Sequence, residues 1–252
     1  MSKQRFYIPT RGNDDEAYKE ALKFACELAN SDSELTKVIL LIPSKGNTGW
    51  FDRLFGPAIV KELFKGKIFK NCIPIFKFET IKTYKDNFKA GDIVITCGLY
   101  EEDIFKIDDY YCVKAIIAIP WLPEKVQKWI QTWNPIDIRT ETSTLDQVQE
   151  PSCIVKKALE ELTDYVNMGT GIVHPDDNER AKTIIMALHK YEPALDSNLV
   201  GAYLVRELNW DNRHAQDVEK LIITLNNGKH FKGGQRTGLQ NYYKDWKNQC
   251  NQ

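Results

Sequence analysis

The sequence Ile8-Pro9-Thr10-Arg11-Gly12-Asn13 shares its pattern with Ile42-Pro43-Ser44-Lys45-Gly46-Asn47. In both stretches an apolar run ends at a proline, and a hydroxyl, a cation, a glycine and an asparagine follow. Proline is excluded from the interior of a central strand, whereas glycine and asparagine tolerate the turned backbone after a strand. Both stretches are therefore predicted to be strand ends that open into loops.

Several other runs have the composition of strands. Lys37–Ile42, Asp92–Cys97 and Lys114–Ile119 are apolar almost throughout, without alternation. This pattern is typical of strands that are covered on both faces of a parallel sheet. Shorter strands are expected at Arg5–Ile8, Ile73–Phe78 and Ile136–Arg139.

Helices are predicted between the strands, where apolar residues recur at steps of three and four. The first is expected at about 14–30, with Asn13 as its N-cap, and the second at 50–64, with a break at Gly56-Pro57. Two more are expected at 79–88 and in a segment that begins at Pro123. Strands that alternate with helices imply right-handed βαβ units. The predicted fold is an α/β, Rossmann-like three-layer sandwich with a mostly parallel sheet, and 3-2-1-4-5 is its default strand order.

The domain organisation follows from a change of pattern near residue 140. Residues 1–140 form the predicted Rossmann-like domain, and the polar, aperiodic residues 141–151 form a linker. Residues 152–252 form a predicted helical subdomain, in which a helix-turn-helix arrangement is an alternative to simple helix packing. Its helices are expected at about 152–167, 176–191, 196–208 and 212–226, with Asp196 or Ser197 and Asp211 as N-caps and Gly228 as a C-terminal stop.

Composition narrows the class of protein. The 252 residues carry a net charge of -1 and are 42% hydrophobic, which fits a packed globular chain and argues against neutralising phosphates along its whole length. No apolar run approaches the ~20 residues of a membrane helix, so we expect a cytoplasmic protein without a membrane partner. The six cysteines lack two-residue spacing and are expected to be reduced and buried. Cys97, at a predicted strand end, is the one thiol that could face a ligand.

A ligand site is expected at the carboxyl ends of the strands, as in other open parallel sheets. If the first two strands are neighbours, their ends lie about 5 Å apart, and Arg11 and Lys45 can converge on one anion. The leading hypothesis is a small anionic ligand, a nucleotide or nucleotide-derived signal, which could bring a divalent metal with it. The proposed ligand-binding residues are Thr10, Arg11, Gly12, Asn13, Ser44, Lys45, Gly46, Asn47, Thr48 and Gly98.

Ordinary turn chemistry is the favoured explanation of either loop when it is taken alone, and only the match between the two loops makes a ligand site an equal alternative. The sequence has neither the Gly-x-Gly-x-x-Gly dinucleotide pattern after its first strand nor a Walker loop, and its four histidines lack zinc-binding spacing. No nucleophile, base and orienting group stand together as a catalytic motif. Hydrolytic turnover of the ligand is left open, with Asp14, Asp15 and Glu101 as candidate bases.

The C-terminal tail suggests an alternative function. Basic residues alternate there with aromatic ones, so a nucleic-acid-binding regulator would use Arg213, Lys229, Lys232 and Arg236. Residues 151–252 nevertheless carry 13 basic and 13 acidic side chains, which favours simple packing. A protein-interaction scaffold with exposed tryptophans is the remaining alternative.

Overall fold

The computed structural model describes residues 3–12, 14–89, 91–192 and 194–251. The chain divides into two compact units, Met1–Asp146 and Gln147–Gln252, and each is described by itself. None of the described helices is long and apolar enough to cross a lipid bilayer.

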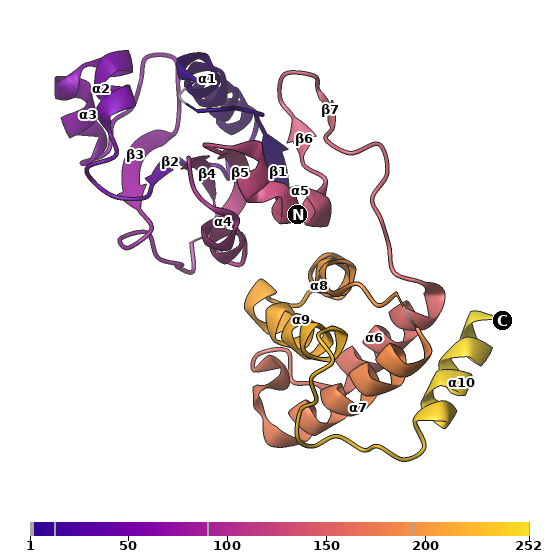
Figure 1. Cartoon of the computed structure of the whole chain (residues 1–252). Coiled ribbons are helices and arrows are strands. Elements are labelled where there is room, and N and C mark those ends of the chain that lie inside the picture. Colours follow the sequence, from indigo (N-terminus) through magenta and orange to yellow (C-terminus); the bar gives the residue numbers. More distant parts are fainter. Residues whose placement is uncertain (1–2, 13, 90, 193, 252) are drawn as a thin grey trace. The chain divides into compact units, whose positions relative to one another are not determined.

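The first unit confirms the predicted α/β fold (Figure 1). Its seven-stranded sheet is parallel except for the antiparallel pair β6 and β7. In chain order the elements are β1 Gln4–Tyr7, α1 Asp15–Ser31, β2 Lys37–Ile42, α2 Gly49–Phe55, α3 Pro57–Leu63, β3 Ile75–Thr80, β4 Asp92–Cys97, α4 Glu101–Asp108, β5 Val113–Ile119, the 3-10 turn η1 Pro123–Val126, α5 Gln127–Trp133, β6 Ile136–Asp137 and β7 Thr142–Ser143.

Two apolar cores lie on opposite faces of this sheet, which gives the three layers. On one face Leu40 and alternate strand residues pack with α1, α2 and α3. On the other face Leu41 and the intervening residues pack with α4 and α5 (Figure 1). Consecutive residues of β2 are buried on both sides, as its unbroken apolar sequence predicts.

The strand order is β3-β2-β4-β5-β1-β6-β7, so the expected order 3-2-1-4-5 is wrong. β4 and β5 stand between β2 and β1. The physical reason is burial: β4 is buried at every residue, whereas β1 has only four residues and begins with the exposed Gln4. Central positions favour strands that are apolar on both faces, and β1 is displaced towards the edge.

Three segments differ from the predicted secondary structure. The helix expected at 79–88 is absent, because Thr80 and Thr83 exchange hydrogen bonds between their hydroxyls and backbone amides and so form a turn in place of a helix. Tyr84 then enters the core and donates to Asp92 Oδ2 at 2.9 Å. Helix α4 was not predicted, and β7 lies within the segment expected to be a linker.

The remaining helices of this unit follow the sequence closely. The break expected at Gly56-Pro57 is observed, since Gly56 has φ 79° and separates α2 from α3. Helix α1 begins after Asp14, whose carboxylate accepts from the Ala17 amide, so Asp14 is the N-cap. The expected N-cap, Asn13, lies outside the described residues.

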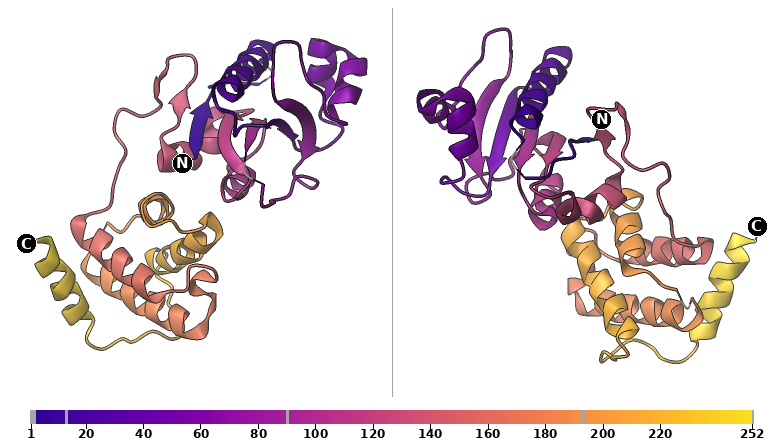
Figure 2. Two further views of the ribbon diagram at one scale, coloured as in Figure 1. Left: turned by 180° about the vertical axis from the view of Figure 1, so that it is seen from behind. Right: turned by 45° about the horizontal axis from the view of Figure 1, so that its top comes forward.

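The second unit is helical throughout its described elements (Figure 2). Asp196 caps α8 as predicted, and Gly228, with φ 68°, follows the end of α9. Asp211 stands at the N-cap position of α9, although its side chain makes no capping hydrogen bond. The elements are α6 Cys153–Tyr165, the 3-10 turn η2 Gly171–Val173, α7 Pro175–Tyr191, α8 Ser197–Arg206, α9 Asn212–Asn226 and α10 Leu239–Cys250, and α10 packs on α6 and α7.

Four of the six cysteines form disulfides, so the expectation that all are reduced is wrong. Cys26 pairs with Cys72, and Cys153 pairs with Cys250, with Cα atoms 5.6 and 5.9 Å apart. Each pair is distant in sequence and becomes adjacent only through tertiary packing. Cys97 is free but fully buried, and burial raises the pKa of its thiol, which argues against the reactive role suggested for it.

Candidate functional site

A cavity of about 320 Å³ lies at the carboxyl ends of the central strands. The chain leaves β2 through α2 and α3 on one face of the sheet and leaves β4 through α4 on the other. The connections of these neighbouring strands diverge, which creates the crevice where open α/β sheets bind ligands. The lining comes from the loops after β2, β4 and β5: Pro43, Asn47, Trp50, residues 97–100, Trp121, Leu122 and Lys125.

Aromatic rings form much of the wall of this sheet-edge pocket. The ring centroids of Trp50 and Trp121 are 6.3 Å apart, with the rings tilted by 42°. Trp50 also stacks on Tyr18 of α1, at 6.0 Å and 17°, which fixes its orientation. Trp121 is 46% exposed, so part of the residue remains open to solvent. Aromatic rings of this kind stack on planar ligands.

The polar groups of the pocket are few. The Lys125 ammonium lies 5.8 Å from the ring centroid of Tyr100, and its positive charge also acts on the exposed Glu124 carboxylate. Ser44 donates to Asn47 Oδ1, which orients that amide. The indole N–H of Trp50 is buried and has no hydrogen-bond partner among the described residues. A buried donor of this kind calls for an acceptor, such as a ligand or water.

The loop after β1 is hydrogen-bonded to the segment that carries Trp121. Thr10 is buried and donates its hydroxyl to the carbonyl of Pro120. The Gly12 amide, at φ 78°, donates to the carbonyl of Trp121 at 2.7 Å. These bonds fix the backbone that carries Trp121. The Gly12 amide is therefore occupied and cannot bind an anion, contrary to the expectation from the sequence. Asn13, the last candidate of this loop, lies outside the described residues.

The expected convergence of Arg11 and Lys45 is wrong, because two strands separate the strands they follow. At the usual spacing, three steps across a sheet amount to about 14 Å. Arg11 instead pairs with Glu124 at 2.7 Å, and both side chains are exposed. Lys45 is exposed on the loop after β2.

The other candidates of the loops after β2 and β4 have mixed roles. Asn47 and Gly98 line the pocket, whereas Gly46 is exposed beside it in sequence. The Gly98 amide donates to the Ile119 carbonyl at 2.8 Å and is therefore occupied. Thr48 precedes α2 and contacts the Asp52 carboxylate through its hydroxyl at 3.2 Å.

The three candidate bases all have structural partners. Burial tends to raise the pKa of Asp14, but hydrogen bonds from the Ala17 amide and Arg139 outweigh it and lower the pKa. A hydrogen bond from Arg53 lowers the pKa of Asp15. Burial raises the pKa of Glu101, partly offset by a 3.0 Å hydrogen bond from the Lys128 amide.

The basic residues proposed for nucleic-acid binding are spread over the helical unit. Arg213, in the first turn of α9, pairs with Asp211 at 3.2 Å. Arg236 donates to the Phe231 carbonyl, and Lys229 and Lys232 lie between α9 and α10. Of the six tryptophans, Trp121 alone is among the exposed large apolar residues of the described chain. The structure therefore gives little support to a scaffold that binds a partner through several exposed tryptophans.

Of the ligand-binding residues that the sequence predicted, Asn47 and Gly98 line this pocket, whereas its aromatic residues and its lysine were not predicted. Trp50, Tyr100, Trp121 and Lys125 were not among the predicted ligand-binding residues. A usable signal was present, since Trp121 directly follows the proline that ends β5. Sequence motifs for anion binding consist mainly of glycines and basic residues, whereas the wall of this pocket is mainly aromatic, so those motifs did not predict its residues.

Comparisons with known proteins bear on the helical unit alone. A family model described as a domain of unknown function, DUF1889, matches residues 151–247. No curated protein and no solved structure matches the chain. Among the described residues there is also no group of three or more His, Cys, Asp or Glu side chains that could hold a metal ion.

Proposed function

We propose that the first unit binds a small anionic ligand with a planar ring, most simply a mononucleotide, in the sheet-edge pocket. The observation that carries the proposal is the aromatic pair Trp50 and Trp121 at the β2/β4 crevice, with Lys125 on the same lining. The pair provides a stacking surface, and the lysine provides charge for a phosphate.

The size of the pocket limits the ligand. A volume of about 320 Å³ stands at the low end of the range for ligand sites, which suits a mononucleotide better than a dinucleotide. The mainly apolar lining also favours a ligand that buries a ring over a bare phosphate. Hydrolytic turnover would require a base, and Glu101, which follows Tyr100 of the pocket, is the nearest candidate in sequence.

Calorimetric titration with AMP, GMP, CMP and UMP tests this proposal, with adenosine as the uncharged comparison. At least one nucleotide is expected to bind, and Trp121→Ala is expected to lower its affinity about tenfold or more, since stacking on an aromatic ring contributes ~1–3 kcal/mol. Tyr111→Ala is the matched control, because Tyr111 is 61% exposed and lies outside the pocket lining. Equal binding by wild type and Trp121→Ala would reject the site.

Nucleic-acid binding by the tail and a cytoplasmic location stay predictions of the sequence. No specific contact of Arg213, Lys229, Lys232 or Arg236 favours nucleic acid over packing. Truncation after residue 225, followed by DNA binding measured at several salt concentrations, tests that alternative, because phosphate contacts weaken steeply with salt.

A further inference from the structure

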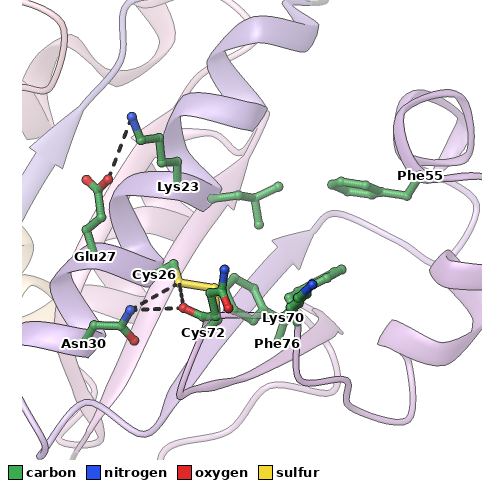
Figure 3. A pocket seen from close by; sticks show the side chains of 11 residues that line it. Lys23, Cys26, Glu27, Asn30, Phe55, Lys70, Cys72 and Phe76 are labelled. Atoms are coloured by element: carbon green, nitrogen blue, oxygen red, sulfur yellow. Dashed lines mark hydrogen bonds and ion pairs between the residues drawn. A yellow bond between two sulfur atoms is a disulfide. The ribbon is translucent and has the colours of Figure 1, made fainter.

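A second cavity, of about 540 Å³, lies between α1, the end of α2 and the segment before β3 (Figure 3). It shares no lining residue with the sheet-edge pocket. Its volume is within the range of small-molecule sites. Its lining includes Leu22, Lys23, Phe55, Phe69, Lys70 and Phe76.

The interior of this second pocket is apolar. Phe55 and Phe69 have ring centroids 6.2 Å apart, and Phe69 and Phe76 meet edge to face at 5.1 Å. Phe76 is only 1% exposed and joins the pocket to the core. In Figure 3, Phe55 extends from α2 towards α1, which carries Lys23. Three aromatic rings and Leu22 offer a surface for hydrocarbon rather than for a polar ligand.

One wall of the pocket is fixed in place. The disulfide between Cys26 and Cys72 joins α1 to the segment before β3. Beside it, Asn30 donates to the Asn71 carbonyl at 3.3 Å and accepts from the Ile73 amide at 3.2 Å. A covalent bond and two hydrogen bonds therefore hold this wall against collapse, which lowers the ordering cost of binding.

The polar residues at the pocket have an excess of positive charge. Lys23 and Glu27 form an exposed pair at 3.8 Å on α1, which cancels their charges locally. Lys70 is exposed and has no ion-pair partner among the described residues. An apolar interior beside one unpaired cation matches a molecule with an apolar body and an anionic head.

We propose that the second pocket binds a small amphipathic anion, with its hydrocarbon part against Phe55, Phe69 and Phe76 and its head group at Lys70. Free amphipathic anions in solution and anionic lipids in a bilayer share this chemistry. Ile68 and Ile73, 60% and 70% exposed in the same segment, add apolar surface that either source could use.

Two probes with the same chain and opposite charge test the proposal. Dodecanoate and dodecyltrimethylammonium are titrated calorimetrically below their micelle concentrations, and dodecanoate is expected to bind more tightly. Lys70→Ala should lower dodecanoate affinity about two- to fivefold, as for an exposed ion pair, and should not lower the affinity of the cation, whose repulsion it relieves. Lys65→Ala, at another exposed lysine outside the lining, should change neither affinity. Equal binding of the two probes would overturn the assignment of the head group.

A photoreactive dodecanoate locates the bound chain without relying on a variant. Cross-links are expected in peptides that contain residues 22–30, 55 and 69–76, and cross-links confined to other peptides would overturn the proposal. Leu22→Trp, which fills the cavity, should abolish labelling in a protein whose circular dichroism is unchanged.

Vesicles identify the source of the ligand. If phosphatidylglycerol vesicles bind and dodecanoate displaces them, the ligand is a membrane lipid. If dodecanoate binds and these vesicles do not, the ligand is a free amphipathic anion. Either result supports the pocket, whereas binding of neither probe nor vesicles would overturn it.

Discussion

The rings of Trp50 and Trp121 lie 6.3 Å apart, although the strands that they follow, β2 and β5, are separated by β4. The contact is possible because both loops turn over the carboxyl end of β4, where Gly98 and Leu99 complete the lining. The loop after β1 holds this arrangement through its bond from Gly12 to Trp121. The aromatic wall is thus assembled from distant parts of one sheet edge.

Lys125→Ala should reduce the affinity for the phosphate-bearing ligand and leave the affinity for adenosine unchanged. The expected loss is about two- to fivefold, because the lysine is exposed and water screens its charge. The AMP affinity of the variant should also depend less on salt. Lys114→Ala is the matched control, since Lys114 lies 5.8 Å from the Tyr111 ring in the same kind of contact outside the pocket. An equal loss in both variants would show that Lys125 has no specific role.

Asp108→Ala should strongly destabilise the first unit. Its carboxylate accepts from Arg5 and from the Trp129 indole, with donor–acceptor distances of 2.9 Å, and its side chain is only 2% exposed. Loss of one partner of a buried pair costs about 3–5 kcal/mol, because the other charge is left unpaired. Urea unfolding measures the free energy. Glu16→Ala, which breaks an exposed pair with Lys19, should cost less than about 1 kcal/mol.

The number of cysteine thiols that react with a labelling reagent, counted by mass spectrometry, should differ among the folded, the denatured, and the denatured and reduced protein. The folded, unreduced protein should react slowly because its two free thiols, Cys97 and Cys112, are buried. After denaturation two thiols should react, and after denaturation with reduction all six should react. Six labels without reduction would contradict both disulfides. Since disulfides persist mainly in oxidising compartments, the same counts on protein taken directly from cells test the predicted cytoplasmic location.

Gly171→Ala should destabilise the helical unit. Gly171 has φ 57°, and a Cβ atom there would lie 2.5 Å from Cγ of the buried His214 ring. The left-handed backbone alone costs a residue with a side chain roughly 1–2 kcal/mol, and the overlap with the ring adds to it. Gly169→Ala is the control, because its nearest neighbour would be 3.4 Å away. Thermal unfolding should separate the two variants clearly.

Asp14→Asn should make the free energy of unfolding depend less on pH below about pH 4. Burial opposes ionisation of Asp14, but the bonds from Ala17 and Arg139 hold its pKa below the ordinary value of 3.8. A carboxyl group with a lowered pKa in the folded state stabilises the protein above pH 3.8, and this contribution is lost as the pH falls further. Asparagine keeps the capping acceptor but not the charge, so the loss at neutral pH should be below about 1 kcal/mol. Asp14→Ala, which also removes the cap, should be less stable than Asp14→Asn at every pH.

The sequence was sufficient for the fold class because its strands are short, apolar and unbroken. Lys37–Ile42 and Asp92–Cys97 were located at their observed bounds, and Gly56 marked the break between two helices. Strand order could not be obtained in the same way. It depends on which strands bury the most apolar surface at the centre of the sheet. β4 and β5 lie between β2 and the short β1 for this reason.

The candidate site was predicted as a set of loops and only in part as a set of residues. Asn47 and Gly98 line the pocket, whereas Arg11 is occupied by Glu124 and the Gly12 amide by the Trp121 carbonyl. The aromatic residues were missed because their approach depends on the true strand order. The disulfides were missed for a similar reason, since Cys153 and Cys250 are separated by 97 positions in sequence.

Native mass spectrometry of freshly purified protein tests the central claim most directly, when the wild type is compared with Trp121→Ala/Lys125→Ala. We expect the wild type to retain a nucleotide-sized adduct that denaturing extraction releases, and we expect the folded double variant to lack it. An adduct of the same mass and occupancy on both proteins would contradict the assignment of the sheet-edge pocket. A wild type that carries no adduct and binds none of the four mononucleotides would contradict nucleotide binding itself.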